Sequence, residues 1–279
     1  MRIGQHLQKL RIERRVTLAQ AAGTDCSPST LSRFENGRSQ LPAEVFINII
    51  TRLHLDWAEF RPTPGTQQSA LIGQYHQAVT SRSAYQLLTL REALQDNQHR
   101  PLLYRTEYYI VELTLARDFP ETLTASPQLI QTALDYLVKI DYWNDAAFTL
   151  ASLLTPHVPI TVLDNLARHA IYQSRDGQPS AEEVDRTTIL LADIALKKAR
   201  RGDFHGAETT LTSCQLPAIP PLFTAMRHKF VAAFIRWRQG DEAGREQVQA
   251  LLKLLETLDA GDVAARWRQE IKSPTGDRH

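Results

Sequence analysis

Apolar residues recur at helical spacing along most of the 279-residue chain. Near the N-terminus, Ile3, Leu7 and Leu10 stand at positions i, i+4 and i+7, which predicts an amphipathic helix over residues 3–15. Beyond residue 70, segments rich in Leu and aromatic residues keep the helical period and are separated by short turns. The sustained period-two alternation that marks β-strands does not occur. The pattern predicts an all-α protein.

The helix with the most complete start and stop signals is expected over residues 28–36. Ser27 is a favourable N-cap, Pro28 suits the first helical position, and Gly37 can take the left-handed conformation that ends a helix. The other faces carry short or basic hydrogen-bonding groups, namely Ser29, Thr30, Ser32, Arg33 and Asn36. These groups suit the edge of a DNA groove, and an ordinary short amphipathic helix is the alternative.

Short helices are expected on both sides of this segment. Thr17 would cap a helix over residues 18–22, whose alanines permit the close helix crossing of a helix-turn-helix. Pro42 would open a fourth helix with a broad apolar face, and Asp56 would cap a short fifth helix. We therefore predict a five-helix helix-turn-helix DNA-binding domain over residues 1–61.

The rest of the chain is predicted to be a helical-repeat domain. Residues 62–69 are Pro, Gly and polar residues, the composition of a linker. The region 70–279 has clear helix boundaries, among them Ser126-Pro127 and a capping box of Ser180 with Glu183. These signals predict an α-solenoid of tetratricopeptide-like helical hairpins, whose concave face would suit an extended peptide.

A recurring Gly-Asp pair supports the repeat interpretation. It occurs at 202–203, 240–241 and 261–262, and each Gly is expected to end one helix while the Asp caps the next. The first two pairs lie 38 residues apart, close to the length of a two-helix repeat.

Composition and motifs narrow the classes of function. Residues 1–61 hold 9 Lys and Arg against 6 Asp and Glu, and the rest 23 against 25, so the first domain is +3 and the remainder −2. No segment has the apolar length of a signal sequence or membrane span, and Cys26 and Cys214 form no CxxC pair, so we expect a cytoplasmic protein without membrane contact. HExxH, GxGxxG and phosphate-loop motifs are absent. We expect no enzyme activity, no cofactor and no metal.

The first domain resembles the phage-repressor-type helix-turn-helix, and most closely the Rgg branch of peptide-pheromone-responsive regulators. The residues that carry the resemblance are Gly4-x-x-Leu7-x-x-Leu10-Arg11, Thr17-Leu18 with Ala22, and Ser27-x-Ser29-x-Leu31-Ser32-Arg33-Phe34-Glu35-x-Gly37. The resemblance implies a structural ion pair between Arg11 and Glu35. It also places Ser29, Thr30 and Arg33 at base edges, and Thr17, Gln20, Ser27, Asn36 and Arg38 at phosphates. Arg15 departs from the family, which usually has a helix-ending Gly at that point.

The resemblance extends, less specifically, into the second domain. It rests there on Ile140-Asp141-Tyr142-Trp143, Gly202-Asp203-Phe204-x-x-Ala207 and Arg238-Gln239-Gly240. It implies that residues 70–279 dimerise the protein and bind a short hydrophobic signalling peptide, as in quorum sensing. A homodimer would read an inverted-repeat operator in double-stranded DNA, because one recognition helix reads only a few base pairs.

An apolar ridge near the C-terminus is the candidate dimer contact. It consists of Leu251, Leu252, Leu255, Leu258 and Trp267. The ridge would be buried either against a second subunit or against its own preceding helices, and the sequence leaves both open.

Candidate peptide-binding residues are polar or aromatic groups within apolar helices, because an extended peptide needs hydrogen bonds to its backbone beside apolar pockets. They are Tyr104, Tyr108, Asn165, Arg168, Arg186, Asp193 and Arg227. For each, a solvated charge or a core aromatic is the alternative. Three functions stay open: a transcriptional regulator switched by a peptide, a DNA-binding regulator whose repeat domain docks a protein or small ligand, and a repeat scaffold that does not bind DNA.

Overall fold

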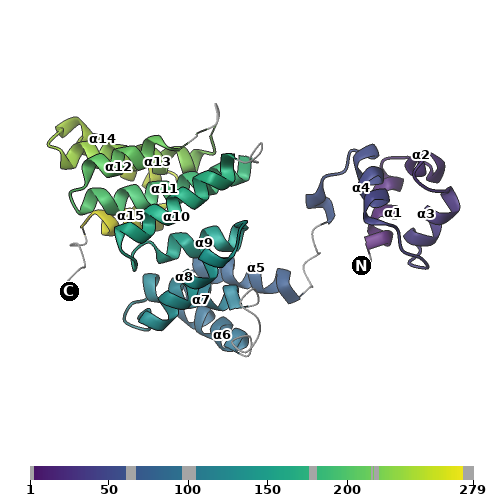
Figure 1. The fold of residues 1–279 in the computed structure, drawn as a ribbon, viewed down its shortest axis with the longest axis horizontal. Coiled ribbons are helices and arrows are strands. Elements are labelled where there is room, and N and C mark those ends of the chain that lie inside the picture. Colours follow the sequence, from purple (N-terminus) through teal and green to yellow (C-terminus); the bar gives the residue numbers. More distant parts are fainter. Residues whose placement is uncertain are drawn as a thin grey trace. The chain divides into compact units, whose positions relative to one another are not determined.

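The computed structural model describes residues 3–60, 67–95, 105–175, 181–214, 216 and 220–272. Across these residues the secondary structure is helical, without a β-strand, which confirms the predicted all-α class (Figure 1). The chain divides into two compact units, residues 1–77 and 78–279. None of the described helices is long and apolar enough to cross a membrane.

The first unit begins with the helices expected of a helix-turn-helix. They are α1 (Ile3–Glu13), α2 (Leu18–Ala22), α3 (Pro28–Glu35), α4 (Ala43–Arg52) and the short 3-10 helix η1 (Trp57–Phe60). The Thr17 side chain accepts a hydrogen bond from the Gln20 N–H, and the Ser27 side chain accepts one from the Thr30 N–H. Gly37 follows α3 with φ 69°. The predicted caps of α2 and α3 and the stop after α3 are therefore confirmed.

The short fifth helix is present as η1, which carries Trp57 and Phe60. One detail of this unit differs from the family pattern. Arg15, at the position where the family has Gly, has φ 56°. The left-handed conformation costs an L-residue about 1–2 kcal/mol, so the chain turns here without the residue best suited to the turn.

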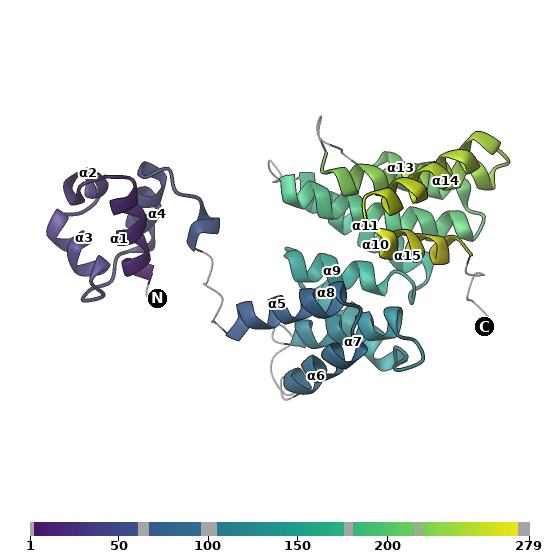
Figure 2. The ribbon, with the colours of Figure 1, turned by 180° about the vertical axis from the view of Figure 1, so that it is seen from behind.

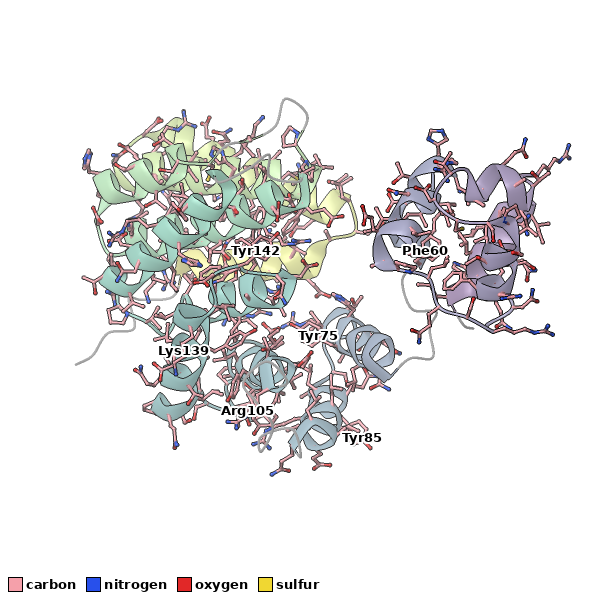
Figure 3. The ribbon with its side chains drawn as sticks, turned by 45° about the vertical axis from the view of Figure 1, so that its right-hand side comes forward. Phe60, Tyr75, Tyr85, Arg105, Lys139 and Tyr142 are labelled. Atoms are coloured by element: carbon pink, nitrogen blue, oxygen red, sulfur yellow. The ribbon has the colours of Figure 1, made fainter. Side chains whose placement is uncertain are left out.

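One apolar cluster forms the core of the helix-turn-helix. Leu7 and Leu31 are fully buried in it. The ring of Phe46 lies edge-on to those of Phe34 and Phe60, with centroids 5.9 and 5.3 Å apart. Phe60, labelled in Figure 3, comes from η1. The short turn therefore completes this core.

Helix α5 (Gln67–Thr80) begins inside the segment expected to be a linker. Residues 67–69 form its first turn, and residues 61–66 lie outside the described residues. The composition was misleading at 67–69 because Gln and Ser are tolerated in helices, unlike the Pro and Gly residues that precede them.

The second unit is a stack of helical hairpins (Figures 1 and 2). Its helices are α6 (Ala84–Gln95), α7 (Thr106–Asp118), α8 (Pro127–Lys139), α9 (Asp145–Leu154), α10 (Ile160–Arg175), α11 (Ala181–Arg200), α12 (Phe204–Thr212), α13 (Leu222–Arg238), α14 (Glu242–Thr257) and α15 (Gly261–Lys272). Helices α7, α9, α11 and α13 each pack on the next, and α6, α8, α10 and α14 pair with them in turn. Such a row of stacked hairpins is the predicted α-solenoid.

The first two Gly-Asp turns have the expected geometry. Gly202 and Gly240 have φ of 84° and 99°, values that an L-residue rarely adopts. The carboxylates of Asp203 and Asp241 then cap α12 and α14. At 126–127 the Ser side chain caps α8 and the Pro opens it, also as expected. Ser180, expected to form a capping box, lies outside the described residues.

The prediction for the third Gly-Asp turn is wrong. Gly261 begins α15 instead of ending α14, which stops at Thr257. Asp259 takes the left-handed conformation, with φ 56°, and the Ala260 N–H donates to the Leu255 carbonyl at 2.8 Å. Because Asp tolerates this conformation better than most residues, the helix ends before the glycine is reached.

The apolar ridge near the C-terminus packs mainly within its own unit. Leu252, Leu255 and Trp267 are 5%, 3% and 2% exposed, in one cluster with residues of α11 and α13. Leu254 and Leu258, on other faces, remain 43% and 53% exposed. Of the two alternatives for the ridge, burial against its own helices accounts for the largest side chains.

Gly4 permits a close contact between α1 and α3, because a Cβ at this position would lie 2.1 Å from the Phe34 carbonyl oxygen. We predict that Gly4→Ala lowers the free energy of unfolding by about 1–3 kcal/mol, since α1 or α3 must shift to relieve the overlap. Urea unfolding of the full chain measures this loss. Gly73→Ala is the control: nothing lies within 4 Å of a Cβ there, and Ala is the better helix former by about 1 kcal/mol. Parent-like stability of Gly4→Ala would contradict the tight contact.

Candidate DNA-binding face and ligand pocket

A buried ion pair joins α1 to α3. Arg11 Nε and Nη2 donate to the two carboxylate oxygens of Glu35 at 2.7 and 2.8 Å, and Arg11 Nη1 donates to the Val16 carbonyl at 2.7 Å. Both side chains are buried, and the hydrogen bond to Glu35 raises the pKa of Arg11 against the effect of burial. The ion pair implied by the family resemblance is present, and it holds the recognition helix on α1.

The outer face of α3 carries the side chains expected at base edges. Ser29 and Arg33 are exposed, and Thr30 is half-buried at the start of the helix. Ser29, Arg33 and Asn36 follow i, i+4 and i+7 and therefore share one face. Within the described residues, the Arg33 guanidinium makes no hydrogen bond or ion pair. Its donors are available to a base edge or a phosphate.

The residues expected at phosphates surround this face, and all of them are exposed: Thr17, Gln20, Ser27, Asn36 and Arg38. Local hydrogen bonds hold four of them in place. Thr17 and Gln20 form a reciprocal capping box, Ser27 caps α3, and Asn36 Nδ2 donates to the Ser32 carbonyl at 2.7 Å. The Arg38 N–H donates to the Arg33 carbonyl at 2.8 Å, and its side chain makes no hydrogen bond among the residues that the structure describes. All eight expected DNA-binding residues thus lie on or beside α2 and α3.

A second anchor of the helix-turn-helix was not predicted. Arg52, at the end of α4, donates to the Ala21 carbonyl at 2.8 Å and pairs with Asp25 in the turn before α3. Asn48 donates to the same carboxylate at 2.9 Å, and these bonds lower the pKa of Asp25. A Cβ on Gly23 would lie 2.6 Å from the Arg52 guanidinium. Helix α4 therefore fixes the turn, through residues too far apart in sequence to form a local motif.

The second unit contains a pocket of about 510 Å³. Its lining comes from α7, α9, α11, α13 and α15 and from the turns that end α9 and α11. Leu196, Phe223 and Trp267 contribute apolar surface, and most of the remaining side chains are charged. This size is in the range of pockets that bury small ligands or a few residues of a peptide.

Arg227 lies in the wall of this pocket and is almost fully buried. Its Nη2 donates to Asp193 Oδ1 at 2.6 Å, and its Nη1 donates to Glu270 Oε2 at 2.7 Å. The guanidinium carbon is 5.1 Å from the ring centroid of Trp267. Burial opposes the charge, but the two carboxylates together raise the pKa of Arg227 above its usual value. Asp193 and Arg227, two of the expected peptide-binding residues, are thus brought together in the pocket.

Tyr108 has a different position from the one expected of a ligand contact. Its hydroxyl donates to Glu112 Oε1 at 2.6 Å, and the same oxygen accepts a hydrogen bond from Arg91 Nε at 2.6 Å. Burial, followed by the bond to Glu112, raises the pKa of Tyr108 to about 12. Tyr108 is buried and supports the Arg91–Glu112 contact between α6 and α7. It does not line the pocket, so the core alternative applies to it.

The other expected peptide-binding residues also lie away from the pocket lining. Arg186 pairs with Asp145 at 2.8 Å and with Glu182 at 3.1 Å, which ties α11 to the start of α9. Asn165 and Arg168 are exposed on α10 and hydrogen-bonded to each other. Tyr104 lies outside the described residues.

Five cationic residues of the pocket were missed by the sequence analysis. They are Arg117, Lys197, Arg200, Arg201 and Arg266. They come from α7, from the last turn of α11 and the residue that follows it, and from α15. No local spacing relates α7 to α15, so only the fold brings these charges together.

Comparison with known proteins agrees with both units. Residues 2–61 match the family model described as a helix-turn-helix domain. The whole structure is similar to that of the SHP pheromone receptor Rgg2 from Streptococcus dysgalactiae, with a TM-score of 0.79 and 18% sequence identity over 97% of this chain and 99% of that chain. It is also similar to the PrgX/cCF10 complex, with a TM-score of 0.73 and 11% identity over 96% and 90% of the two chains.

The chain is therefore a helix-turn-helix protein with a helical-repeat second domain. Its fold is the one seen in Rgg2, along almost the whole length of both chains. The resemblance predicted from the residues of the first domain is thus confirmed for the fold.

Removing the charge of Glu35 tests whether the ion pair with Arg11 holds α3 in place. We predict that Glu35→Gln destabilises the first unit by about 3–5 kcal/mol, because it leaves the Arg11 charge buried without compensation. Hydrogen exchange of the α1 and α3 amides in the full chain would become faster. Glu13→Gln is the control, since its contact with Lys9 is exposed and long, at 3.8 Å. Unchanged exchange in Glu35→Gln would contradict the structural role of the pair.

Proposed function

We propose that this protein is a sequence-specific DNA-binding transcriptional regulator whose activity is switched by a short hydrophobic signalling peptide. The observation that carries the proposal is the combination, in one chain, of an exposed recognition helix with a pocket in a helical-repeat domain. The proteins with similar structures include a pheromone receptor and a bacterial peptide pheromone/receptor complex, which supports a peptide as the ligand class. The protein would act by binding, in the cytoplasm, without catalysis or a cofactor.

On DNA, α3 would lie in the major groove. Ser29, Thr30 and Arg33 would approach base edges, and the N-termini of α2 and α3 with Asn36 and Arg38 would bind phosphates. The caps of α2 and α3 support this arrangement, because Thr17 and Ser27 are already held in place by hydrogen bonds before they meet the DNA phosphates. The Arg11–Glu35 pair and the Arg52 clamp would hold the helix rigid while it reads the groove.

Substitutions of Arg33 and Arg38 distinguish a contact to a base from a contact to a phosphate. Fragments selected from genomic DNA by the full chain supply the specific site, and a random duplex supplies the non-specific one. We predict that Arg33→Ala weakens specific binding by about 1–3 kcal/mol and random binding much less, as expected of a contact to guanine. Arg38→Ala should weaken both about equally and reduce the slope of log affinity against log salt by about one.

The DNA experiment has one control variant and two outcomes that would contradict the proposal. Lys9→Ala, an exposed substitution on α1, is the control and should bind both duplexes like the parent. Equal losses on both duplexes would reduce Arg33 to a phosphate contact. If no genomic fragment is enriched, the DNA-binding half of the proposal is wrong and the scaffold alternative stands.

We also propose that the regulator is a homodimer. One recognition helix contacts too few base pairs for useful specificity, so two would bind half-sites about one helical turn, or a multiple, apart. Leu254 and Leu258 leave an apolar edge on α14 that is only partly covered by its own unit, which supports an intersubunit contact there.

Sedimentation of the full chain at micromolar concentration tests the dimer. We expect a dimer in the parent, and a weakened dimer in Leu254→Glu because a buried charge at an interface is costly. Glu246→Gln, an exposed change on the same helix, is the control. A monomeric parent would contradict the homodimer, and a fully dimeric Leu254→Glu would exclude this edge of α14 from the interface.

A further inference from the structure

The charges of the pocket lining are strongly unbalanced. Six of its residues are cationic, the five missed by the sequence analysis together with Arg227, whereas only Asp193 and Glu270 are anionic. Arg227 binds both of these carboxylates itself. The pocket lining therefore holds six cations and two carboxylates, and both carboxylates are bound to Arg227.

The five cations other than Arg227 come from three helices and from the residue that follows one of them. Lys197 and Arg200 lie in the last turn of α11 and Arg201 follows it, Arg117 comes from α7, and Arg266 comes from α15. The C-terminal end of a helix attracts cations, which explains in part how α11 tolerates its cluster. Arg117 also has a carboxylate neighbour outside the lining, Asp118, at 2.8 Å.

Arg266 differs from the other cations of the pocket. Among the residues that the structure describes, it makes no hydrogen bond and no ion pair, although it is half-buried. Lys197, by comparison, donates to the carbonyls of Thr155 and Val158 at 2.8 and 2.6 Å and so fastens the chain between α9 and α10. Against the effect of burial, the hydrogen bond from Arg117 and then the charges of Arg117 and Arg266 lower the pKa of Asp118. Arg266 nevertheless donates no hydrogen bond within the described residues, so its five donors are available to a ligand.

The cations at the end of α11 lie close enough together to affect one another. Burial, and then the charges of Arg201 and Arg200, lower the pKa of Lys197 to about 8. Burial likewise lowers the pKa of Arg200, with Arg201 and Arg238 acting in the same direction and Glu270 against it. An anion bound among these groups would offset their mutual repulsion.

The same space has an apolar side. Leu196, Phe223 and Trp267 line it, and the Phe223 and Trp267 rings are 5.8 Å apart. A small inorganic anion would use the cations and leave this surface in contact with water. A ligand that combines a carboxylate with apolar side chains would use both parts of the wall.

We propose that this pocket binds the carboxylate of a short apolar peptide, with Arg266 as its partner and with Phe223 and Trp267 against the neighbouring apolar side chain. The inference rests on the proposed function, because it takes a peptide as the ligand. It adds that the effector peptide is recognised through a carboxylate. The carboxylate is either the C-terminus or an acidic side chain, and both have the same chemistry toward a guanidinium.

Four libraries of N-acetylated hexapeptides test the assignment on the full-length protein. Each library is randomised over Gly, Ala, Val, Ile, Leu, Phe and Trp. The C-terminus is either a free acid or an amide, and one position either does or does not carry Asp or Glu. Peptides retained by the protein are identified by mass spectrometry. We expect peptides that contain a carboxylate to be enriched about tenfold or more over neutral amides, the effect of one charge-assisted hydrogen bond.

Variants at two arginines of α15 link the selection to the pocket. Arg266→Gln should lose about tenfold in affinity for the selected peptide, and Arg266→Lys should recover part of it. Arg268→Gln is the matched control: Arg268 lies on the same helix, does not line the pocket, and pairs with Glu256 at 2.6 Å. Equal binding by Arg266→Gln and Arg268→Gln would overturn the assignment of Arg266.

The pattern of selection separates the possible outcomes. Enrichment of free acids without acidic side chains assigns the terminal carboxylate, and enrichment of amides with Asp or Glu assigns the side chain. Enrichment of neutral amides to the same level would overturn the anion site while leaving the peptide function intact. If no library is retained, the peptide function fails.

If no peptide library is retained, two fluorescent probes still test the anion site. We expect the anionic 8-anilinonaphthalene-1-sulfonate to bind more tightly than the uncharged N-phenyl-1-naphthylamine, and this preference to disappear in Arg266→Gln. The same preference in parent and variant would overturn the anion site on its own.

Discussion

The second unit depends on the buried charge of Arg227. This residue of α13 binds Asp193 of α11 and Glu270 of α15 and lies against the ring of Trp267. Removing one partner of a buried ion pair costs about 3–5 kcal/mol, so the three helices are held at a fixed spacing by one guanidinium. Both carboxylates of the pocket lining are bound to this one guanidinium, in a wall that holds five further cations. This interaction therefore fixes the helices that shape the site.

The first unit uses the same principle for a different purpose. Arg11 is buried against Glu35 and fixes α3 on α1, whereas Arg33, on the outer face of α3, has no partner within the described residues. In each unit a buried arginine holds the framework and an arginine outside it remains available to an anion. In the first unit that anion would be DNA, and in the second unit it would be a peptide carboxylate. A buried pair need not stabilise the fold overall to serve in this way, since it specifies one arrangement of helices.

The sequence predicted those features that depend on local chemistry. The caps at Thr17 and Ser27, the stop at Gly37 and the turn at Gly202 involve groups within a few residues of each other, so their patterns are visible in the chain. The prediction at Gly261 failed because another residue, Asp259, could take the left-handed conformation first. The resemblance supplied the Arg11–Glu35 pair, which spacing alone would not have given.

The site in the second unit was only partly predictable for a physical reason. Asp193 and Arg227 were found because a charge within an apolar helix needs a partner, but the same rule selected Arg186, whose partners lie at the start of α9 and on its own helix. Tyr108 was chosen by its aromatic character and is used in the α6–α7 core. Arg117 and Arg266 look like ordinary surface charges until the stacked hairpins bring α7 and α15 to one pocket.

If the protein is a peptide-switched regulator, a peptide in the pocket of the second unit must change the affinity of the first unit for DNA. The most direct measurement is the affinity of the full chain for its selected DNA site, with and without a saturating concentration of the selected peptide, at one salt concentration. Linkage requires the two sites to affect each other equally, and coupling in such proteins is commonly about 5–150-fold. We expect the peptide to change the DNA affinity by a factor within that range. In Arg266→Gln the same change should require a higher peptide concentration. The same DNA affinity with the pocket empty and saturated would contradict the account.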